Sequence, residues 1–520
     1  MKYDVTKEPC IAVTMLDGST TNLTFTDVLK NAHEIKCLGP DDLSPYDQYA
    51  LYRFLSLFVQ DIFRPCGYRD TLNLFKIGLF DSFTIDEYFD GCRKIGVTFD
   101  LFDEKRPFMQ TPKSFFNKDA SDTIGSISIG DTNIHGIRKL NPEYRYGTND
   151  VFYNGNVYLN YGMSAHQYFA CILRNLMFHI FVGGGWKSSI KGSNGAAPIG
   201  FVMSGQNLFE TLILSLSGMN SKDYEKAVPI WKKDVPYVDP KEIEDKYGSL
   251  SDDGCSWLDI AIVPQMFLYG EPEDDGFVHK VSIRQLKIVE TLSPTLSQII
   301  IKSDTCIIKG DNKKGDETKS HMPNKDEPDY KSLAAINAEK YFDGSLKIIR
   351  AIKNSHSNEN DTVNISFYMF ATPYQGKGFY ISEKIDFPNV PISFYEDENI
   401  KKAHFVIDEI DRASKELIKK LKNYIAESTT GHEYDDDKKK NKKNKDFALI
   451  RNINANFYKR ARHIFISDFV PNIEIDGIED ETIRKIRSEA LAFYKKVPRV
   501  CNDFIEYYKN MSLLEKSLNK

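Results

Sequence analysis

Apolar side chains recur every three to four residues in several long stretches of this chain, which is the period of an amphipathic helix. The first stretch opens at Ser44-Pro45, where serine can cap a helix and proline suits its first position, and it continues to Ile62. A second stretch fills residues 165–181 after Ser164, and a third covers Leu208–Leu216. We therefore predict three helices whose apolar sides face a core.

Shorter segments have the features of strands and turns. Asp17-Gly18 is a favourable hairpin turn between the strand-like segments Ile11–Leu16 and Thr20–Phe25. Much later, Asn364–Met369 and Phe379–Phe387 are typical of strands on either side of a turn. Helices and strands are thus mixed before the C-terminal part of the chain.

From Glu396 onward the helical period dominates. It predicts helices at about 398–427, 446–468, 480–508 and 510–518, and successive helices of this kind form an up-down bundle. The fold class we expect is α+β, with a large mixed N-terminal domain of irregular topology (1–395) followed by a C-terminal four-helix bundle (396–520). A chain of 520 residues is too long for one ordinary core, which agrees with two domains.

Three polar segments interrupt this pattern. Residues 117–150 are rich in Gly and Asn and have almost no helical period, so we predict a long loop that is functional or disordered. Residues 309–330 form a charged insertion, which we predict to be a mobile surface loop. The lysine run 438–445 is predicted to be a solvated loop, and its functional alternative is an accessory, salt-sensitive contact to a phosphate backbone.

Composition limits the classes of function. An apolar content of 41% and a charged content of 27% are those of a soluble globular protein, and the net charge of −6 means that any contact with a polyanion is local. The eight cysteines include no Cys-x-x-Cys pair, so we expect no structural zinc site. We also expect a cytoplasmic protein whose cysteines are reduced thiols. The longest apolar stretch is too short and too interrupted to span a membrane.

The segment 183–198 is the most unusual in the chain. It reads GGGWKSSIKGSNGAAP, with Lys187 and Lys191 among its glycines, and it directly follows the apolar helical stretch. Such a segment can approach an anionic polymer or a phosphate closely. It does not match a nucleotide-binding P-loop, because Trp186 rather than glycine precedes Lys187. The structural alternative is a helix C-cap followed by a surface loop.

Two further motifs have both a structural and a functional interpretation. The tip Tyr374–Gly378 contains Gln375, which can hydrogen-bond base edges or wedge between base pairs, although a plain β-turn is the simpler interpretation. In Arg106–Thr111, Phe108 and Met109 are predicted core residues. Gln110 and Thr111 are candidate polar latches, but composition alone favours ordinary packing.

Motifs of catalysis are missing from the sequence. It has no His-x-x-x-His pair, no Gly-x-Ser-x-Gly elbow and no Walker pair, so we expect neither an enzyme nor a bound metal or cofactor. Two alternatives stay open from the residues alone. One is a nucleotide-binding hydrolase built on 183–195, and the other is a purely structural scaffold subunit.

Two motifs together resemble a known family. Arg-Pro-Phe-Met-Gln-Thr at 106–111, followed by Gly-Gly-Gly-Trp-Lys-Ser at 183–188 after a helix, resembles the CasA family, the large subunit of the type I-E CRISPR Cascade complex. The resemblance implies a non-catalytic, DNA-binding subunit of an antiviral ribonucleoprotein complex. It also implies recognition of the protospacer-adjacent motif (PAM) of double-stranded target DNA, strand separation, and recruitment of a helicase–nuclease effector. Guide RNA and the backbone subunits of Cascade would be its other partners.

The resemblance also assigns residues. The family's glycine loop falls on Gly183, Gly184 and Gly185, with Gly184 facing the motif, and its glutamine wedge on Gln375 beside Gly376. Lys287 is the best match to the family's lysine finger, and Lys280 is the second. A mobile loop near the guide 5′ end corresponds to about 120–140, where Asn133, His135 and Arg138 are the expected nucleic-acid contacts. Some family members carry paired, zinc-binding cysteines, which this chain lacks.

Overall fold

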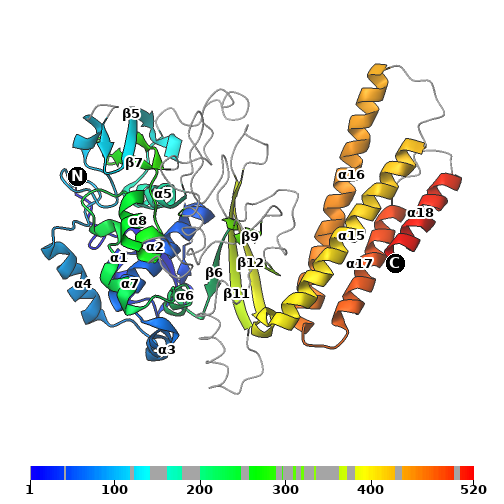
Figure 1. Ribbon diagram of the computed structural model, residues 1–520, viewed down its shortest axis with the longest axis horizontal. Helices are drawn as coiled ribbons and strands as arrows, with labels where there is room; N and C mark the ends of the chain where they lie inside the picture. The colour runs from blue at the N-terminus through cyan, green and yellow to red at the C-terminus, as the bar shows by residue number, and fades with distance from the viewer. Residues whose placement is uncertain are drawn as a thin grey trace. The chain divides into compact units, whose positions relative to one another are not determined.

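The fold is that of a computed structural model, shown in Figure 1. It describes residues 2–39, 43–117, 122–140, 161–178, 199–247, 257–288, 296, 309–311, 318–320, 333–334, 362–371, 381–427, 436–496 and 504–519. The chain divides into two compact units. The first comprises Met1–Lys325, Tyr341–Asn358 and Val363–Pro388, and the second Asp326–Lys340, Glu359–Thr362 and Asn389–Lys520.

Helix α2 (Pro45–Phe63) lies at the centre of the first unit and is buried over almost its whole length. Ser44 caps it by accepting a hydrogen bond from the backbone N–H of Asp47, and Pro45 occupies the first turn, as the sequence predicts. Its Phe58 ring stacks on Trp231 with ring centroids 4.2 Å apart and meets Phe25 edge-on at 4.8 Å. Aromatic pairs of this geometry contribute beyond the area that they bury.

A three-stranded antiparallel sheet has the strand order β2-β1-β3. Strands β1 (Ile11–Met15) and β2 (Thr20–Leu23) are joined by the predicted hairpin, whose Gly18 has a φ of 86°. Strand β3 is Ile35–Leu38. Around this sheet and α2 pack several shorter helices: α1 (Phe25–Lys30), α3 (Gly67–Ile77), α4 (Ser82–Lys94), α6 (Leu208–Leu214), α7 (Ser221–Lys226) and α9 (Trp257–Ile260). Helix α8 (Pro240–Tyr247) instead contributes Ile243 to the core of the second sheet.

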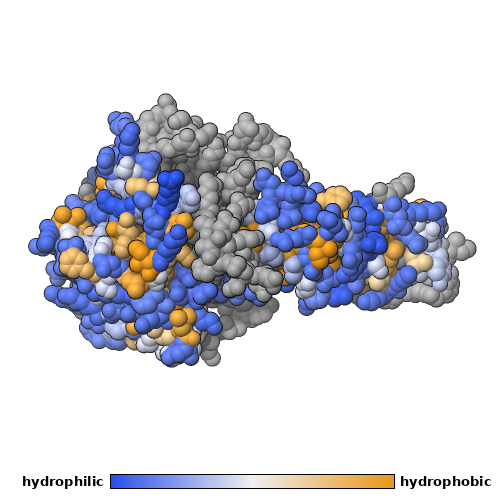
Figure 2. Space-filling model, turned by 90° about the horizontal axis from the view of Figure 1, so that it is seen from below, coloured by the Kyte–Doolittle hydropathy of each residue, from blue (hydrophilic) through white to orange (hydrophobic). Residues whose placement is uncertain are grey.

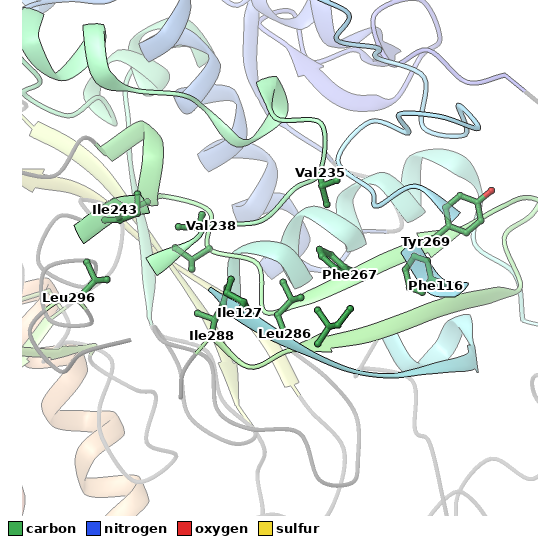
Figure 3. Close-up of a cluster of buried hydrophobic side chains, with 13 residues drawn as sticks. Phe116, Ile127, Val235, Val238, Ile243, Phe267, Tyr269, Leu286, Ile288 and Leu296 are labelled. Carbon is green, nitrogen blue, oxygen red and sulfur yellow. The ribbon is translucent and has the colours of Figure 1, made fainter. Parts of the chain in front are cut away.

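A second sheet of the first unit corrects one prediction. Its strands follow the order β4 (Thr123–Ile124), β5 (Ile127–Gly136), β8 (Lys280–Leu286) and β7 (Met266–Gly270). The predicted long loop over 117–150 is therefore wrong for residues 123–136. The cause is pairing with β8, because Ile127 and Ile129 bury their side chains in a core shared with Phe267 and Leu286 (Figure 3). A short 3-10 helix, Ile137–Leu140, follows β5.

A third sheet has the order β12-β11-β6. Strands β11 (Thr362–Ala371) and β12 (Ile381–Pro391) confirm the two predicted strands, and β11 pairs antiparallel with β6 (Gly200–Ser204). The predicted turn between them lies outside the described residues. Within the predicted loop 309–330, β9 (Lys309–Asp311) pairs with β10 (Thr318–Ser320), so this segment contains a hairpin.

The second unit contains the predicted helical bundle. Helix α15 (Asp397–Glu427) contacts α16 (Asp436–Ile464), α17 (Ile478–Lys495) and α18 (Phe504–Leu518), as the yellow to red ribbons of Figure 1 show. Buried side chains of α15 recur every three or four residues, which is the spacing of bundle packing: Ala403, Val406, Ile410, Ala413, Leu417, Leu421 and Tyr424. Between α16 and α17 the chain forms a π-helix, Phe465–Phe469, and a 3-10 turn, Val470–Asn472.

Two predictions about the bundle need correction. The expected single helix over 480–508 is two helices, because α17 ends at Lys495 before Pro498, a residue that interrupts helical hydrogen bonding, and α18 begins at Phe504. The lysine run 438–445 lies inside α16 rather than in a loop. Lysine is a good helix former, so a charged run can extend a helix whose remaining residues pack against α15 and α17.

The face of the molecule in Figure 2 is mainly hydrophilic over the described residues. On the face in Figure 2, hydrophobic residues form small separate groups among hydrophilic ones over the part that the structure describes. The more exposed large apolar side chains include Phe83 and Ile77, beside the connection between α3 and α4. None of the described helices is long and apolar enough to cross a membrane.

Candidate nucleic-acid interface

The predicted site residues fall into two sets. Asn133, His135, Arg138, Lys280 and Lys287 belong to the described structure. The others lie outside the described residues: Gly183, Gly184, Gly185, Lys187, Lys191, Gln375 and Gly376. The described elements nearest to them in sequence are α5 (Ala165–Phe178) and β6, which precede and follow the glycine-rich segment, and β11 and β12, which flank Gln375.

The described candidates come together in one sheet. In the antiparallel pairing of β5 with β8, Asn133 lies opposite Ile283, His135 opposite Val281 and Gly136 opposite Lys280. The expected guide-contacting segment and both lysine candidates are therefore neighbours, although about 150 positions separate them in the sequence. The expectation of a mobile loop there is wrong, because these residues belong to a paired strand and a 3-10 turn.

The two lysine candidates occupy opposite ends of β8. Lys280 is the first residue of the strand, near His135, and its Nζ lies 3.0 Å from an oxygen of Glu273. Lys287 is exposed just after the strand, and its backbone N–H donates to Ser128 O at 3.0 Å. Seven residues of strand separate them by roughly 23 Å at about 3.3 Å per residue. One DNA contact cannot involve both lysines.

His135 is half-buried on β5. Burial lowers the pKa of its imidazole, and the positive charge of Lys139 lowers that pKa further. The ring is therefore neutral at pH 7. His135 is suited to a hydrogen bond with a base or a ribose rather than to an ionic contact with a phosphate.

Arg284 supports β5 from inside the sheet, a role that the sequence analysis missed. Its buried side chain donates from Nε to Gly130 O at 2.8 Å and from Nη1 to Phe115 O at 2.7 Å. The bond to Gly130 lies at the irregularity in pairing between Ile129 and Thr132. The one signal in the sequence is a charged arginine inside the strand-like segment Val-Ser-Ile-Arg-Gln-Leu.

The segment Arg106–Thr111 is an internal anchor rather than a surface. Phe108 and Met109 are buried, as predicted, and Met109 adopts a left-handed φ of 57°. Arg106 donates from Nη2 to Lys232 O at 2.7 Å. Gln110, which composition alone assigned to ordinary packing, is a fully buried polar latch between three segments of the chain.

The connection between β7 and β8 holds the residues that precede α5. Met163 and Val278 exchange two backbone hydrogen bonds, of 3.0 and 2.8 Å. His279 contacts Asp275 at 2.7 Å and Tyr161 O at 3.2 Å, and chiefly the hydrogen bond with Asp275 raises the pKa of His279. Gly162 is required here, because a Cβ would lie 2.6 Å from the His279 ring.

The electrostatics of this region are mixed. Lys113 pairs with Glu271 at 2.7 Å, and Lys280 pairs with Glu273, so acidic groups neutralise part of the positive charge beside the sheet. Among the residues whose placement the structure gives, no group of three His, Cys, Asp or Glu side chains is arranged to hold a metal ion. The region can therefore offer hydrogen bonds and isolated cations to a ligand.

Comparisons with known proteins identify relatives. The family model described as CRISPR-associated protein Cse1 matches residues 4–254. CRISPR-associated protein CasA/Cse1 of Thermus thermophilus is 26% identical over 237 residues, which are 44% of this chain and 42% of that protein. The matched segment thus spans less than half of that relative.

Two solved structures share the fold. A crystal structure of CasA from Thermus thermophilus superposes with a TM-score of 0.70 at 16% identity, covering 100% of this chain and 99% of that one. A chain of a structure named CRISPR RNA-guided surveillance complex gives a TM-score of 0.70 at 16% identity, covering 100% of both chains. At these identities the likeness concerns the fold.

Proposed function

The chain belongs to the CasA/Cse1 family of CRISPR-associated proteins, and from that premise we propose that it is the non-catalytic large subunit of a type I-E surveillance complex. In this role it recognises the PAM of duplex DNA, promotes strand separation and helps to recruit the helicase–nuclease. The observation that carries the proposal is that the family match, residues 4–254, contains both motifs of the resemblance, 106–111 and 183–188.

The proposed partners follow from the same role. They are double-stranded target DNA, guide RNA with the backbone subunits of Cascade, and the helicase–nuclease. The solved relative that is a CRISPR RNA-guided surveillance complex supports an assembly with RNA. Guide pairing would read the target sequence while the protein reads a short motif, a division of labour that other RNA-guided effectors use. The cytoplasm is the proposed place of action.

The glycine-rich segment is the proposed motif reader. A backbone without side chains can enter the minor groove, which is about 6 Å wide, and Gly183, Gly184 and Gly185 supply such a backbone. Lys187 and Lys191 would contact the neighbouring phosphates. Gln375, with Gly376 beside it, is the proposed wedge below the motif, where opening one base step costs on the order of a few kcal/mol.

The β5–β8 pair is the proposed contact to the guide and to the motif-flanking DNA. Asn133, His135 and Arg138 lie on or just after β5, which supports their acting together on RNA. Lys287 is the first candidate for the lysine finger and Lys280 the second. Because they occupy opposite ends of β8, replacing one leaves the surroundings of the other intact.

The test uses the complex assembled with guide RNA and a Gly184→Asp subunit. The carboxylate would place bulk and negative charge in the groove, so affinity for a duplex target with the motif should fall roughly tenfold or more. Gel-shift titration measures this. Affinity for a single strand complementary to the guide should not change, because that binding needs no motif.

Gly218→Asp is the matched control. Gly218 is exposed, no atom lies within 4 Å of a Cβ built on it, and it carries no family motif, so the same charge should leave motif-dependent binding unchanged. Unchanged duplex affinity of an intact Gly184→Asp complex would contradict the proposal and favour a scaffold subunit. ATP hydrolysis that disappears in Lys187→Ala would favour the hydrolase.

A further inference from the structure

We propose that Gln110 is a positioning residue for motif reading, which fixes the N-terminal end of α5, the helix that precedes the glycine-rich segment, against the β7–β8 hairpin. This inference rests on the proposed function, because it assigns a role in that reading to a residue that touches no DNA.

Gln110 connects three distant parts of the first unit with short hydrogen bonds. Its side-chain Nε2 donates to Leu101 O at 2.6 Å. Its Oε1 accepts from the Tyr168 hydroxyl at 2.7 Å and from the Gly270 backbone N–H at 2.8 Å. Only 1% of the residue is exposed, so water does not compete for these bonds. Tyr168 lies in the first turn of α5, and Gly270 is the last residue of β7.

The surroundings are built for this contact. Gly270 lets the Tyr168 ring come close, since a Cβ at position 270 would lie 2.5 Å from the Tyr168 hydroxyl oxygen. Complete burial raises the pKa of Tyr168 well above its usual value, so its hydroxyl keeps the proton that it donates to Gln110. The neighbouring Thr111 N–H also bonds β7, at Leu268 O over 2.9 Å.

The chemistry at this position requires an amide. Leucine at 110 would leave the Tyr168 hydroxyl and the Gly270 N–H buried without an acceptor. An ionised glutamate would accept both bonds but could not donate to Leu101 O. Glutamine supplies a donor and an acceptor on one planar group, which sets the spacing of all three segments together.

The hydrogen bonds of Gln110 have a consequence for the proposed interface. The start of α5 is held by Gln110 and, just before it, by the Met163–Val278 backbone pair. Both contacts reach the β7–β8 hairpin, whose second strand begins at Lys280. Helix α5, which leads to the glycine-rich segment, and the lysine strand are therefore held by the same hairpin. Binding sites tolerate only about 0.5 Å of displacement before they lose function, so loosening this support should weaken motif reading.

The experiment measures motif discrimination in the assembled complex, defined as the Kd for guide-matched duplex without the motif divided by the Kd for duplex with it. Tyr168→Phe removes one donor to Gln110 and keeps the packing, while Gln110→Ala removes the latch. We expect discrimination to fall roughly three- to tenfold in Gln110→Ala and by a smaller factor in Tyr168→Phe. Affinity for the complementary single strand should stay at the wild-type value in both.

Two buried residues elsewhere in the same unit provide matched controls. Gln60 is fully buried and accepts from the Ser217 N–H at 2.8 Å, and the Tyr224 hydroxyl donates to Pro65 O at 3.0 Å. Gln60→Ala and Tyr224→Phe should lower the Tm about as much as the latch variants without changing discrimination. A purely structural role predicts that all four variants behave alike.

The outcomes separate this inference from the proposed function. If the wild-type complex discriminates and the latch variants discriminate equally well, or if the control variants lose as much, Gln110 is no positioning residue while the proposed function stands. If the wild-type complex itself shows no discrimination, the proposed function fails and this inference fails with it. If Gln110→Ala does not assemble, Tyr168→Phe decides by the same criterion.

Discussion

At the scale of single residues, Asp61 shows how this protein accommodates charge in its core. The residue lies on α2 with 2% of its surface exposed. Its carboxylate receives Lys232 Nζ at 2.5 Å, Arg64 Nη2 at 3.0 Å and the Tyr88 hydroxyl at 2.6 Å. Burial, reinforced by the charge of Asp61, raises the pKa of Tyr88 well above its usual value, so that hydroxyl remains a donor. A buried carboxylate is stable here because all three partners are present.

Asp61→Ala should therefore lower the free energy of unfolding by roughly 3–5 kcal/mol, because it leaves the largely buried Lys232 without its partner. Urea denaturation measures the change. Asp86→Ala breaks the pair with Lys30, in which the Asp86 side chain is 56% exposed, and should cost less than about 1 kcal/mol. Equal effects of the two substitutions would mean that the Asp61 cluster contributes no more than a surface pair.

From the sequence, the burial of a residue could be predicted better than its hydrogen-bond partners. Phe108 and Met109 were expected in the core because they are apolar, and both are buried. The role of Gln110 was not accessible in the same way, because its partners Tyr168 and Gly270 are 58 and 160 positions away. A polar residue in an apolar run indicates a latch only when its partners are known.

At the scale of elements, the prediction failed where strand pairing is remote. Residues 127–136 contain Gly, Asp and Asn, which are unfavourable in strands, and the pairing irregularity between Ile129 and Thr132 disrupts their alternation. The partner strand β8 supplies what the local sequence lacks. The helix α2 and the β1–β2 hairpin were predicted correctly because a cap, a proline and a turn glycine are local signals.

Replacing either of two glycines by alanine tests how the elements pack, and we expect the two substitutions to change the free energy of unfolding in opposite directions. Gly200 begins β6, and a Cβ there would fall on the Tyr49 ring of α2, which stacks on Tyr368 at 5.2 Å and cannot easily move away. Gly200→Ala should lower the free energy of unfolding by about 1–3 kcal/mol. Gly91 lies inside α4 with no atom within 4 Å of such a Cβ, so Gly91→Ala should stabilise by up to about 1 kcal/mol.

Thermal and urea unfolding of the two variants measure both effects. Both substitutions add a methyl group, but only the one at Gly200 meets a close neighbour, so a loss of stability there beside a gain at Gly91 indicates the close approach of β6 to α2. A Gly200→Ala protein as stable as the wild type would show that the Tyr49 ring yields without loss of packing.

At the scale of the whole molecule, the two units differ in how far the sequence predicts their folds. The helical bundle was predictable because the alternate three- and four-residue spacing of Ala403, Val406, Ile410, Ala413 and Leu417 repeats within one helix. The first unit was predictable only as a mixed fold, since its sheets pair segments far apart in the sequence, such as β6 with β11 and β5 with β8. Topology of that kind leaves no periodic signal along the chain.

The bundle has a buried core of its own, so we propose that residues 389–520 fold without the rest of the chain. The isolated fragment should give a helical circular dichroism spectrum and a cooperative urea transition. Within it, Leu417→Ala removes a completely buried side chain and should cost about 2–5 kcal/mol, whereas Lys419→Ala on the exposed side should change stability by less than about 0.5 kcal/mol. A gradual transition, or equal effects of the two substitutions, would mean that the bundle core forms only when the first unit is attached.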